Sequence, residues 1–140
     1  MMLLVPVDGS AASEHAVRHA LWLAGGRADA TIVLLNVQNR ETLGLSDIHA
    51  EDEDERQAAA ARSARTLHKA MSACQEAGIR FTTHMEFGPI CDIIIRTARD
   101  IRADQIVMGT RGRGRLRSLV LGSVATGVVH QARIPVTLVK

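Results

Sequence analysis

The stretch that decides the fold is "ADQIVMGTRGRGRLRSLVLGSVATG", which covers residues 103–127. It opens with a short apolar run, which is typical of a buried strand. Glycines and arginines crowd residues 109–117, and a Gly-Ser pair at residues 122–123 then opens a helical pattern. A glycine-rich loop between a strand and a helix suits one small anion, whereas the arginines suit nucleic acid. The predicted fold and the composition of the rest of the chain distinguish these two interpretations.

Strand and helix patterns alternate along the chain. Apolar runs predict strands at residues 2–7, 30–37, 80–87, 103–109 and 135–139. Helical spacing predicts a helix after each of the first four strands, and residues 38–52 are expected to form a loop. This order implies an α/β fold in which helices cover both faces of a parallel sheet. At 140 residues, the chain is expected to be a single domain, 1–140.

Local signals predict how two of the helices begin and pack. Asp8-Gly9-Ser10 follows the first strand and offers a turn and an N-cap for the first helix. The long helix that starts at the acidic run of residues 51–55 is expected to face the core with one stripe, formed by Ala60, Ala64, Leu67, Met71 and Cys74.

Composition disfavours several function classes. Seventeen Lys and Arg against fifteen Asp and Glu leave a formal net charge of +2, which is not typical of a polyanion binder. With one Trp, two Phe and no Tyr, and with the arginines between a strand and a helix rather than in a tail, nucleic acid is an unlikely partner. Two cysteines without a CxxC pair disfavour zinc. No leader precedes the first strand and no apolar run approaches about 18 residues, so we expect a cytoplasmic protein without membrane contact.

The glycine pattern is chemically suited to phosphate. Its spacing is Gly109-x2-Gly112-x9-Gly122-Ser123. Glycine lets a ligand approach the main chain closely, and the unpaired N–H groups of a helix N-terminus favour an anion. Ligands bind beyond the carboxyl ends of parallel strands, where Asp8-Gly9-Ser10 and the loop that starts at Gly109 form one crevice if the first and fourth strands are neighbours whose crossovers leave on opposite faces. The chain has neither GxxxxGK[ST] nor GxGxxG after its first strand, which excludes the commonest phosphate loops.

The glycine pattern in this setting resembles the universal stress protein family. The pattern Gly-x2-Gly-x9-Gly-Ser lies between "ADQIVMG" and "IPVTLV", and the chain opens with "LLVPVDGS". A helix that starts just after Gly88 adds to the match, which covers nearly the whole chain. The resemblance implies a Rossmann-like fold, similar to the adenine nucleotide alpha hydrolases, with a five-stranded parallel sheet of order 3-2-1-4-5. It also implies that ATP is held between strands one and four.

The resemblance also implies a role for individual residues. Asp8 would meet the ribose or the metal-phosphate region, where Mg²⁺ could accompany ATP. Val37 would receive the adenine, and Gly109 would approach the ribose. The base pocket would be lined by Pro6, Val7 and Met108. The phosphates would be wrapped, chiefly by backbone N–H groups, by Gly112, Gly122, Ser123 and Val124.

The expected function is that of an ATP-binding stress-response or signalling module. The family further suggests a homodimer joined along the last strand through Val136 and Leu138, although Pro135 and Lys140 could instead blunt that edge. Two alternatives stay open. In one, the chain hydrolyses ATP slowly or phosphorylates itself, with Asp8 holding a divalent ion and Ser10 or Ser13 accepting phosphate. In the other, it is a non-catalytic regulatory binding partner.

Overall fold

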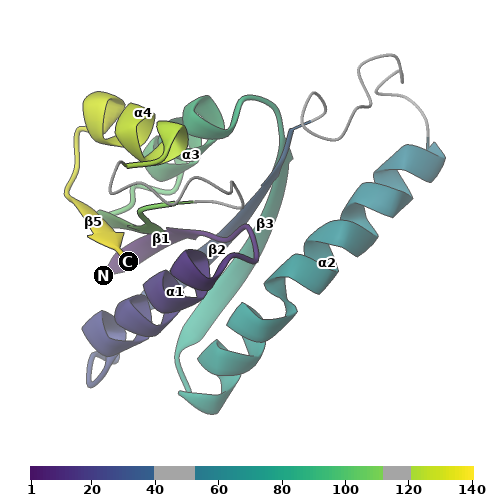
Figure 1. The fold of residues 1–140 in the computed structure, drawn as a ribbon. Coiled ribbons are helices and arrows are strands. Elements are labelled where there is room, and N and C mark those ends of the chain that lie inside the picture. Colours follow the sequence, from purple (N-terminus) through teal and green to yellow (C-terminus); the bar gives the residue numbers. More distant parts are fainter. Residues whose placement is uncertain (40–52, 112–120) are drawn as a thin grey trace.

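The fold is a parallel sheet flanked by helices (Figure 1). The computed structural model describes residues 1–39, 53–111 and 121–140. Its elements, in chain order, are β1 (Met2–Pro6), α1 (Ala11–Ala24), β2 (Thr31–Gln38), α2 (Glu53–Glu76), β3 (Arg80–Phe87), α3 (Ile90–Asp100), β4 (Gln105–Gly109), α4 (Ser123–Gln131) and β5 (Val136–Val139). The loop predicted at residues 38–52 begins later than expected, because Gln38 still belongs to β2; residues 40–52 lie outside the described ranges.

The strand order is β3-β2-β1-β4-β5, and every neighbouring pair is parallel. This confirms the expected fold class and places β1 at the centre. Leu3, Leu4 and Val5 of β1 have no exposed surface. A short run that is apolar on both sides suits a central parallel strand, because helices cover both faces.

The two faces of the sheet are covered by different helix pairs, α1 with α2 on one and α3 with α4 on the other (Figure 1). Alternate residues of β1 separate accordingly, since Leu3 and Val5 pack with α1 and α2, whereas Leu4 packs with α3 and α4. We call these the α1/α2 face and the α3/α4 face. No described helix is both long enough and apolar enough to cross a bilayer.

Helix α2 packs through a different stripe from the one its alanines suggest. Ala60 and Ala64 are exposed, so the prediction that they face the core is wrong. Leu67 and Cys74 are buried as expected. Alanines occupy every position from 58 to 61 and so mark no single side, and the full set of buried residues is Ala59, Ser63, Leu67, Ala70 and Cys74.

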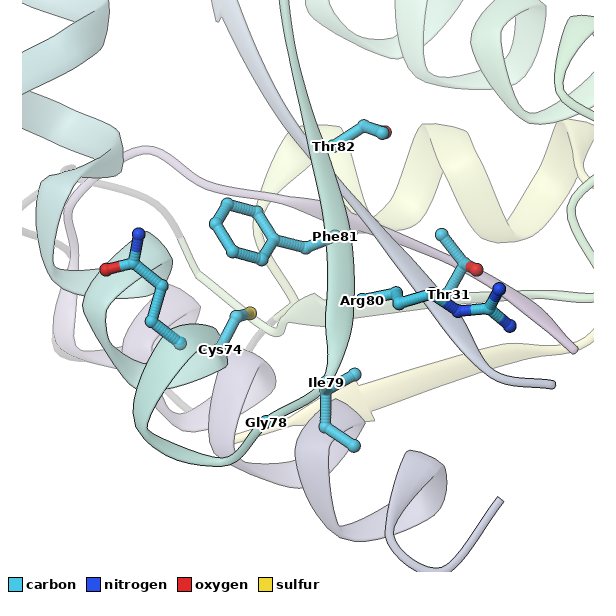
Figure 2. Close-up of a pocket in the computed structure, with 8 residues that line it drawn as sticks. Thr31, Cys74, Gly78, Ile79, Arg80, Phe81 and Thr82 are labelled. Atoms are coloured by element: carbon cyan, nitrogen blue, oxygen red, sulfur yellow. The ribbon is translucent and has the colours of Figure 1, made fainter. Parts of the chain in front are cut away.

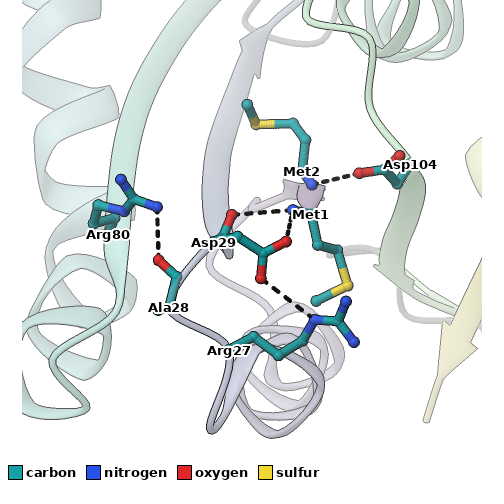
Figure 3. A network of polar contacts seen from close by, with 7 residues as sticks. All are labelled: Met1, Met2, Arg27, Ala28, Asp29, Arg80 and Asp104. Atoms are coloured by element: carbon teal, nitrogen blue, oxygen red, sulfur yellow. Dashed lines mark hydrogen bonds and ion pairs between the residues drawn. The ribbon is translucent and has the colours of Figure 1, made fainter.

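The amino ends of the strands are tied by a network of polar contacts (Figure 3). The Met1 ammonium group donates to the Asp29 carboxylate at 2.9 Å and to the Asp29 carbonyl at 3.0 Å. Beside it, the Met2 N–H donates to the Asp104 carboxylate at 2.6 Å, and Arg80 donates to the Ala28 carbonyl at 2.8 Å. The hydrogen bond from the ammonium group holds the pKa of Asp29 below its ordinary value.

Candidate functional site

The loop after β1 is a tight turn whose polar groups bond to one another. Gly9 has a φ of +78°, in the region that favours glycine. One carboxylate oxygen of Asp8 accepts the Ser10 N–H at 2.9 Å, and the Ser10 hydroxyl accepts the Ser13 N–H at 3.2 Å. Ser10 is therefore the N-cap of α1, as predicted, and the turn engages one of the two Asp8 oxygens.

The two hydroxyls that self-phosphorylation would require are both engaged in this cap. The Ser13 hydroxyl donates to the Ser10 carbonyl at 2.9 Å, and Ser13 is 4% exposed. The Ser10 hydroxyl accepts the capping bond described above. Burial disfavours Ser13 as a phosphoryl acceptor, whereas the half-buried Ser10 hydroxyl would have to weaken its capping bond to act as one.

Gly109, at the end of β4, brings the two loops together. A Cβ at Gly109 would lie 2.8 Å from the Cβ and 2.9 Å from the carbonyl carbon of Ala12, in the first turn of α1. Only a glycine permits this approach. The packing of α1 on β4 thus gives Gly109 a structural reason, apart from the ribose contact implied by the family resemblance.

The loop after β4 resumes at the N-terminus of α4. Gly122 is the N-cap residue, with φ −62° and ψ 156°, and no described side chain caps this helix. The Gly122 N–H donates to the Thr110 carbonyl at 2.9 Å, and the Thr110 N–H donates to the Val139 carbonyl at 2.9 Å. The first helical residues behind this cap are Ser123 and Val124, where main-chain N–H groups and the helix dipole favour an anion.

The structure brings together several of the apolar residues predicted to line the site. Val37, Met108 and Val124 belong to one cluster on the α3/α4 face. Pro6 is half-buried and, by strand alternation, turns to the same face. The Val7 side chain packs on the α1/α2 face instead. Gly112 lies outside the described residues, as do the arginines at 113, 115 and 117.

Two residues in this region were not singled out from the sequence. Thr110 links Gly122 to the end of β5 through the two main-chain bonds given above. Asn36 is 4% exposed, and its side-chain amide donates to the Val7 carbonyl at 2.8 Å. A polar residue inside the apolar run "TIVLLNVQ" was the available signal for Asn36. Thr110 acts through its main chain and leaves no such signal.

A hollow lies at the opposite end of the sheet (Figure 2). It measures about 510 Å³ and sits between the end of α2 and the starts of β2 and β3. Phe81 points from β3 toward α2, whereas Thr82 points away from it (Figure 2). Burial raises the pKa of the Cys74 thiol in its lining to about 11, which makes it a poor nucleophile. The hollow is an open surface without evident chemistry.

The second hollow is smaller and lies between α1 and α2. It measures about 160 Å³, and the Glu14–Lys69 ion pair, at 3.1 Å, joins two residues of its lining. Of the described residues assigned to the nucleotide, only Val7 lines it. Within the described ranges, no three His, Cys, Asp or Glu residues gather to hold a metal. A magnesium ion near Asp8 would therefore take most of its remaining ligands from phosphate oxygens and water.

Comparison with known proteins identifies the family. The sequence model of the universal stress protein family matches residues 1–140. Universal stress protein MJ0531 of Methanocaldococcus jannaschii is 30% identical over 147 residues, which cover 99% of this chain and 81% of that protein. The solved structure of hypothetical protein MJ0577 matches with a TM-score of 0.85 at 22% identity, and covers 99% of this chain and 94% of that one.

Two further structural neighbours were solved with nucleotides. A universal stress protein family protein from Arabidopsis thaliana with AMP bound has a TM-score of 0.72 at 24% identity, with 100% and 91% of the two chains covered. The universal stress protein from Archaeoglobus fulgidus in complex with dAMP has a TM-score of 0.74 at 24% identity, with 100% and 98% covered. At these identities, the likeness shows a shared fold.

Proposed function

The chain belongs to the universal stress protein family, and from this premise we propose that it binds an adenine nucleotide, specifically ATP, at the carboxyl ends of β1 and β4. The observation that carries the proposal is the α4 N-terminus, which has no side-chain cap and follows a glycine-rich loop. The Gly109–Ala12 packing sets this loop beside the Asp8 turn. The neighbours solved with AMP and dAMP support the choice of an adenine nucleotide.

In the proposed complex, the two loops act on different parts of the ligand. Ser123 and Val124 contribute main-chain N–H groups to the phosphates, together with Gly112, whereas Gly122, whose N–H bonds to the Thr110 carbonyl, lets the phosphates approach because it has no side chain. Asp8 uses its remaining carboxylate oxygen for the ribose or for Mg²⁺. The half-buried Val37 and Pro6 and the buried Met108 form the apolar wall for the base, Gly109 lies near the ribose, and Val7 contributes only its main chain.

The sharpest test substitutes Gly122. Its backbone angles, φ −62° and ψ 156°, suit any residue, so Gly122→Val should fold, with a loss of about 1 kcal/mol because valine is a poorer N-cap residue than glycine. The valine side chain would occupy the space in front of the α4 N-terminus and exclude the phosphates. We expect calorimetry with Mg·ATP to show at least about a tenfold loss of affinity, which corresponds to about 1.4 kcal/mol.

The matched control is Ala77→Val, which adds the same side chain at an exposed position beyond α2, at the opposite end of the sheet. It should bind Mg·ATP like the wild type. Equal affinity in wild type and Gly122→Val would remove the assignment of the phosphate site. A wild-type chain that binds neither ATP nor AMP would refute the proposed function altogether.

We further propose a role as a nucleotide-responsive stress or signalling module in the cytoplasm. The engaged Ser10 and Ser13 hydroxyls argue against self-phosphorylation, and among the described residues no side-chain base other than Asp8 is placed beside the proposed phosphate site to activate water. A steady-state turnover assay tests this, and we expect phosphate release at the background rate. Turnover well above background that is lost in Asp8→Ala would favour the enzyme instead.

A homodimer along β5 is also proposed. β5 is an edge strand, and its register with β4 turns the main-chain groups of Val136 and Leu138 away from β4. A second copy could pair with that edge. Val136→Pro would remove an outward N–H and leave the β4 ladder intact, so sedimentation equilibrium should find a dimer for wild type and a monomer for the variant. A wild type that is monomeric at every concentration would exclude this interface.

A further inference from the structure

Asn36 and Gln38 form a buried polar chain at the end of β2, which we call the Asn36 relay. The two side chains are 4% and 7% exposed. Asn36 Nδ2 donates to the Val7 carbonyl at 2.8 Å, and Gln38 Nε2 donates to Asn36 Oδ1 at 2.6 Å. Burying an amide costs free energy unless it is hydrogen-bonded. The two bonds therefore favour these side-chain positions over any in which a buried amide lacks a partner.

The relay acts where β1 leaves the sheet. Val7 lies one residue beyond β1, and its N–H still donates to the Leu35 carbonyl at 2.8 Å. The next group along β1, the Val7 carbonyl, is bonded by the Asn36 side chain. The Asn36 side-chain amide thus joins the segments of β1 and β2 beyond their last paired residues, Pro6 and Leu35.

Fixing the Val7 carbonyl also fixes Asp8. The Val7 C=O and the Asp8 N–H belong to one planar peptide unit, so a bond to the first sets the orientation of the second. The other end of the turn is held by the Ser10 N–H, which donates to the Asp8 carboxylate at 2.9 Å. Asp8 is therefore anchored from both sides, and one anchor comes from a residue of another strand.

We propose that Asn36, oriented by Gln38, is a positioning residue that aims Asp8 at the metal-phosphate region of the nucleotide without touching the ligand. The inference rests on the proposed function. Asn36 is neutral and sits on the α1/α2 side of β2, whereas the predicted base-pocket residue Val37 packs on the opposite face. Its side chain therefore reaches the site through the main chain of Val7 and Asp8 rather than by contact with the base.

The test compares Asn36→Leu with Gln105→Leu by calorimetry. Gln105 is a matched control, because its side-chain amide donates to the Thr137 hydroxyl at 2.5 Å, at the start of β4 and away from Asp8. Asn36→Leu should bind Mg·ATP about tenfold more weakly, the effect of losing about one well-placed hydrogen bond. Gln105→Leu should bind like the wild type.

A double-mutant cycle separates positioning from general destabilisation. If Asn36 acts through Asp8, then Asn36→Leu should cause no further loss of affinity in an Asp8→Ala background. Amide exchange at Ser10, whose N–H bonds to Asp8, should also become faster in Asn36→Leu. Should Asn36→Leu fail to fold, Gln38→Leu takes its place in both backgrounds, with a smaller loss of affinity expected.

The outcomes distinguish the inference from the proposed function. If the wild type binds Mg·ATP and Asn36→Leu binds equally well, the inference alone is wrong. The same holds if the two substitutions reduce affinity independently. If the wild type binds no nucleotide, the proposed function fails, and the inference fails with it.

Discussion

The two ends of the sheet are held together by different forces. At the amino end, charged groups pair near the surface, and the Asp29 side chain that receives the Met1 ammonium group is 67% exposed (Figure 3). At the carboxyl end, Gly109 packs directly on Ala12, and the buried Asn36 amide holds the Val7 carbonyl. The proposed binding site is built at the second of these ends.

This difference predicts how each end responds to change. Exposed ion pairs contribute little, because water and salt screen them. Close packing is less forgiving, because an added atom forces its neighbours to move. A site formed by close packing keeps its geometry before a ligand arrives, which lowers the entropic cost of binding. Substitutions at the two ends should therefore differ in size and in their effect on nucleotide affinity.

The largest expected effect is that of Gly109→Val. Its Cβ alone would lie 2.8 Å from the Ala12 Cβ, so α1 must shift or the strand must bend. We expect the free energy of unfolding, measured by urea denaturation, to fall by about 2 to 3 kcal/mol. Affinity for Mg·ATP should fall as well, because the Asp8 turn leads directly into α1.

A second substitution tests the cause of that loss. Ala12→Gly removes the Cβ nearest to position 109, although the Ala12 carbonyl carbon remains at 2.9 Å. Gly109→Ala should therefore cost less in an Ala12→Gly background than in the wild type. Equal costs in the two backgrounds would show that the contact with Ala12 is not the reason for the glycine.

The case of Gly109 shows where sequence reasoning reached its limit. The pattern singled out this glycine and the family resemblance gave it a ligand, yet a missing Cβ does not reveal which neighbour approaches. Strand positions were easier to predict from the sequence. For example, β3 was predicted at its observed bounds, residues 80–87. At β4 the prediction began at 103, two residues before the observed start at Gln105, because the end of an apolar run does not mark where strand pairing begins. The order of the strands came from the family resemblance rather than from the pattern of elements.

Strand alternation could have sharpened the expected site. Pro6 and Val7 are neighbours, so their side chains must turn to opposite faces, and only one of them can line a given pocket. The structure places Val7 with α1 and α2. The hydrogen bond from Asn36 to Val7 was harder to predict, because it joins residues 29 positions apart and depends on the side-chain rotamer. A single sequence carries no direct record of such a contact.

An intermediate effect is expected from the two serines near the helix N-termini. The Ser10 hydroxyl caps α1, so Ser10→Ala should lower the free energy of unfolding by about 1 kcal/mol in urea denaturation. Ser123 is the first residue of α4 and no capping bond is described there, so Ser123→Ala should leave stability unchanged. The reverse order, with Ser123→Ala the more destabilising, would contradict this view of the carboxyl end.

A smaller effect is expected where α4 packs on α3. A Cβ at Gly127 would lie 2.9 Å from the Cys91 sulfur. The overpacking cost of Gly127→Ala is partly offset by the higher helix propensity of alanine, which leaves a net loss of about 1 kcal/mol or less in urea denaturation. In a Cys91→Ala background the same substitution should become stabilising. A destabilisation of the same size in both backgrounds would mean that Cys91 does not explain the glycine.

The smallest effect is expected at the amino end, from Asp29→Asn. The bond from the Met1 ammonium group lowers the pKa of Asp29, so its stabilising contribution is present above the ordinary carboxyl pKa and is lost as the pH falls through the lowered value. Scanning calorimetry should give the wild type a slightly higher Tm at pH 7, and the two Tm values should converge in strong acid.

Asp100, which is also exposed and pairs only with its neighbour Arg99 among the ion pairs described, provides the control substitution Asp100→Asn. Affinity for Mg·ATP should be unchanged in both variants, because both positions lie at the amino end of the sheet, opposite the proposed site. A Tm difference that persists in strong acid, or a loss of nucleotide affinity in Asp29→Asn, would show that the two ends of the sheet are not independent.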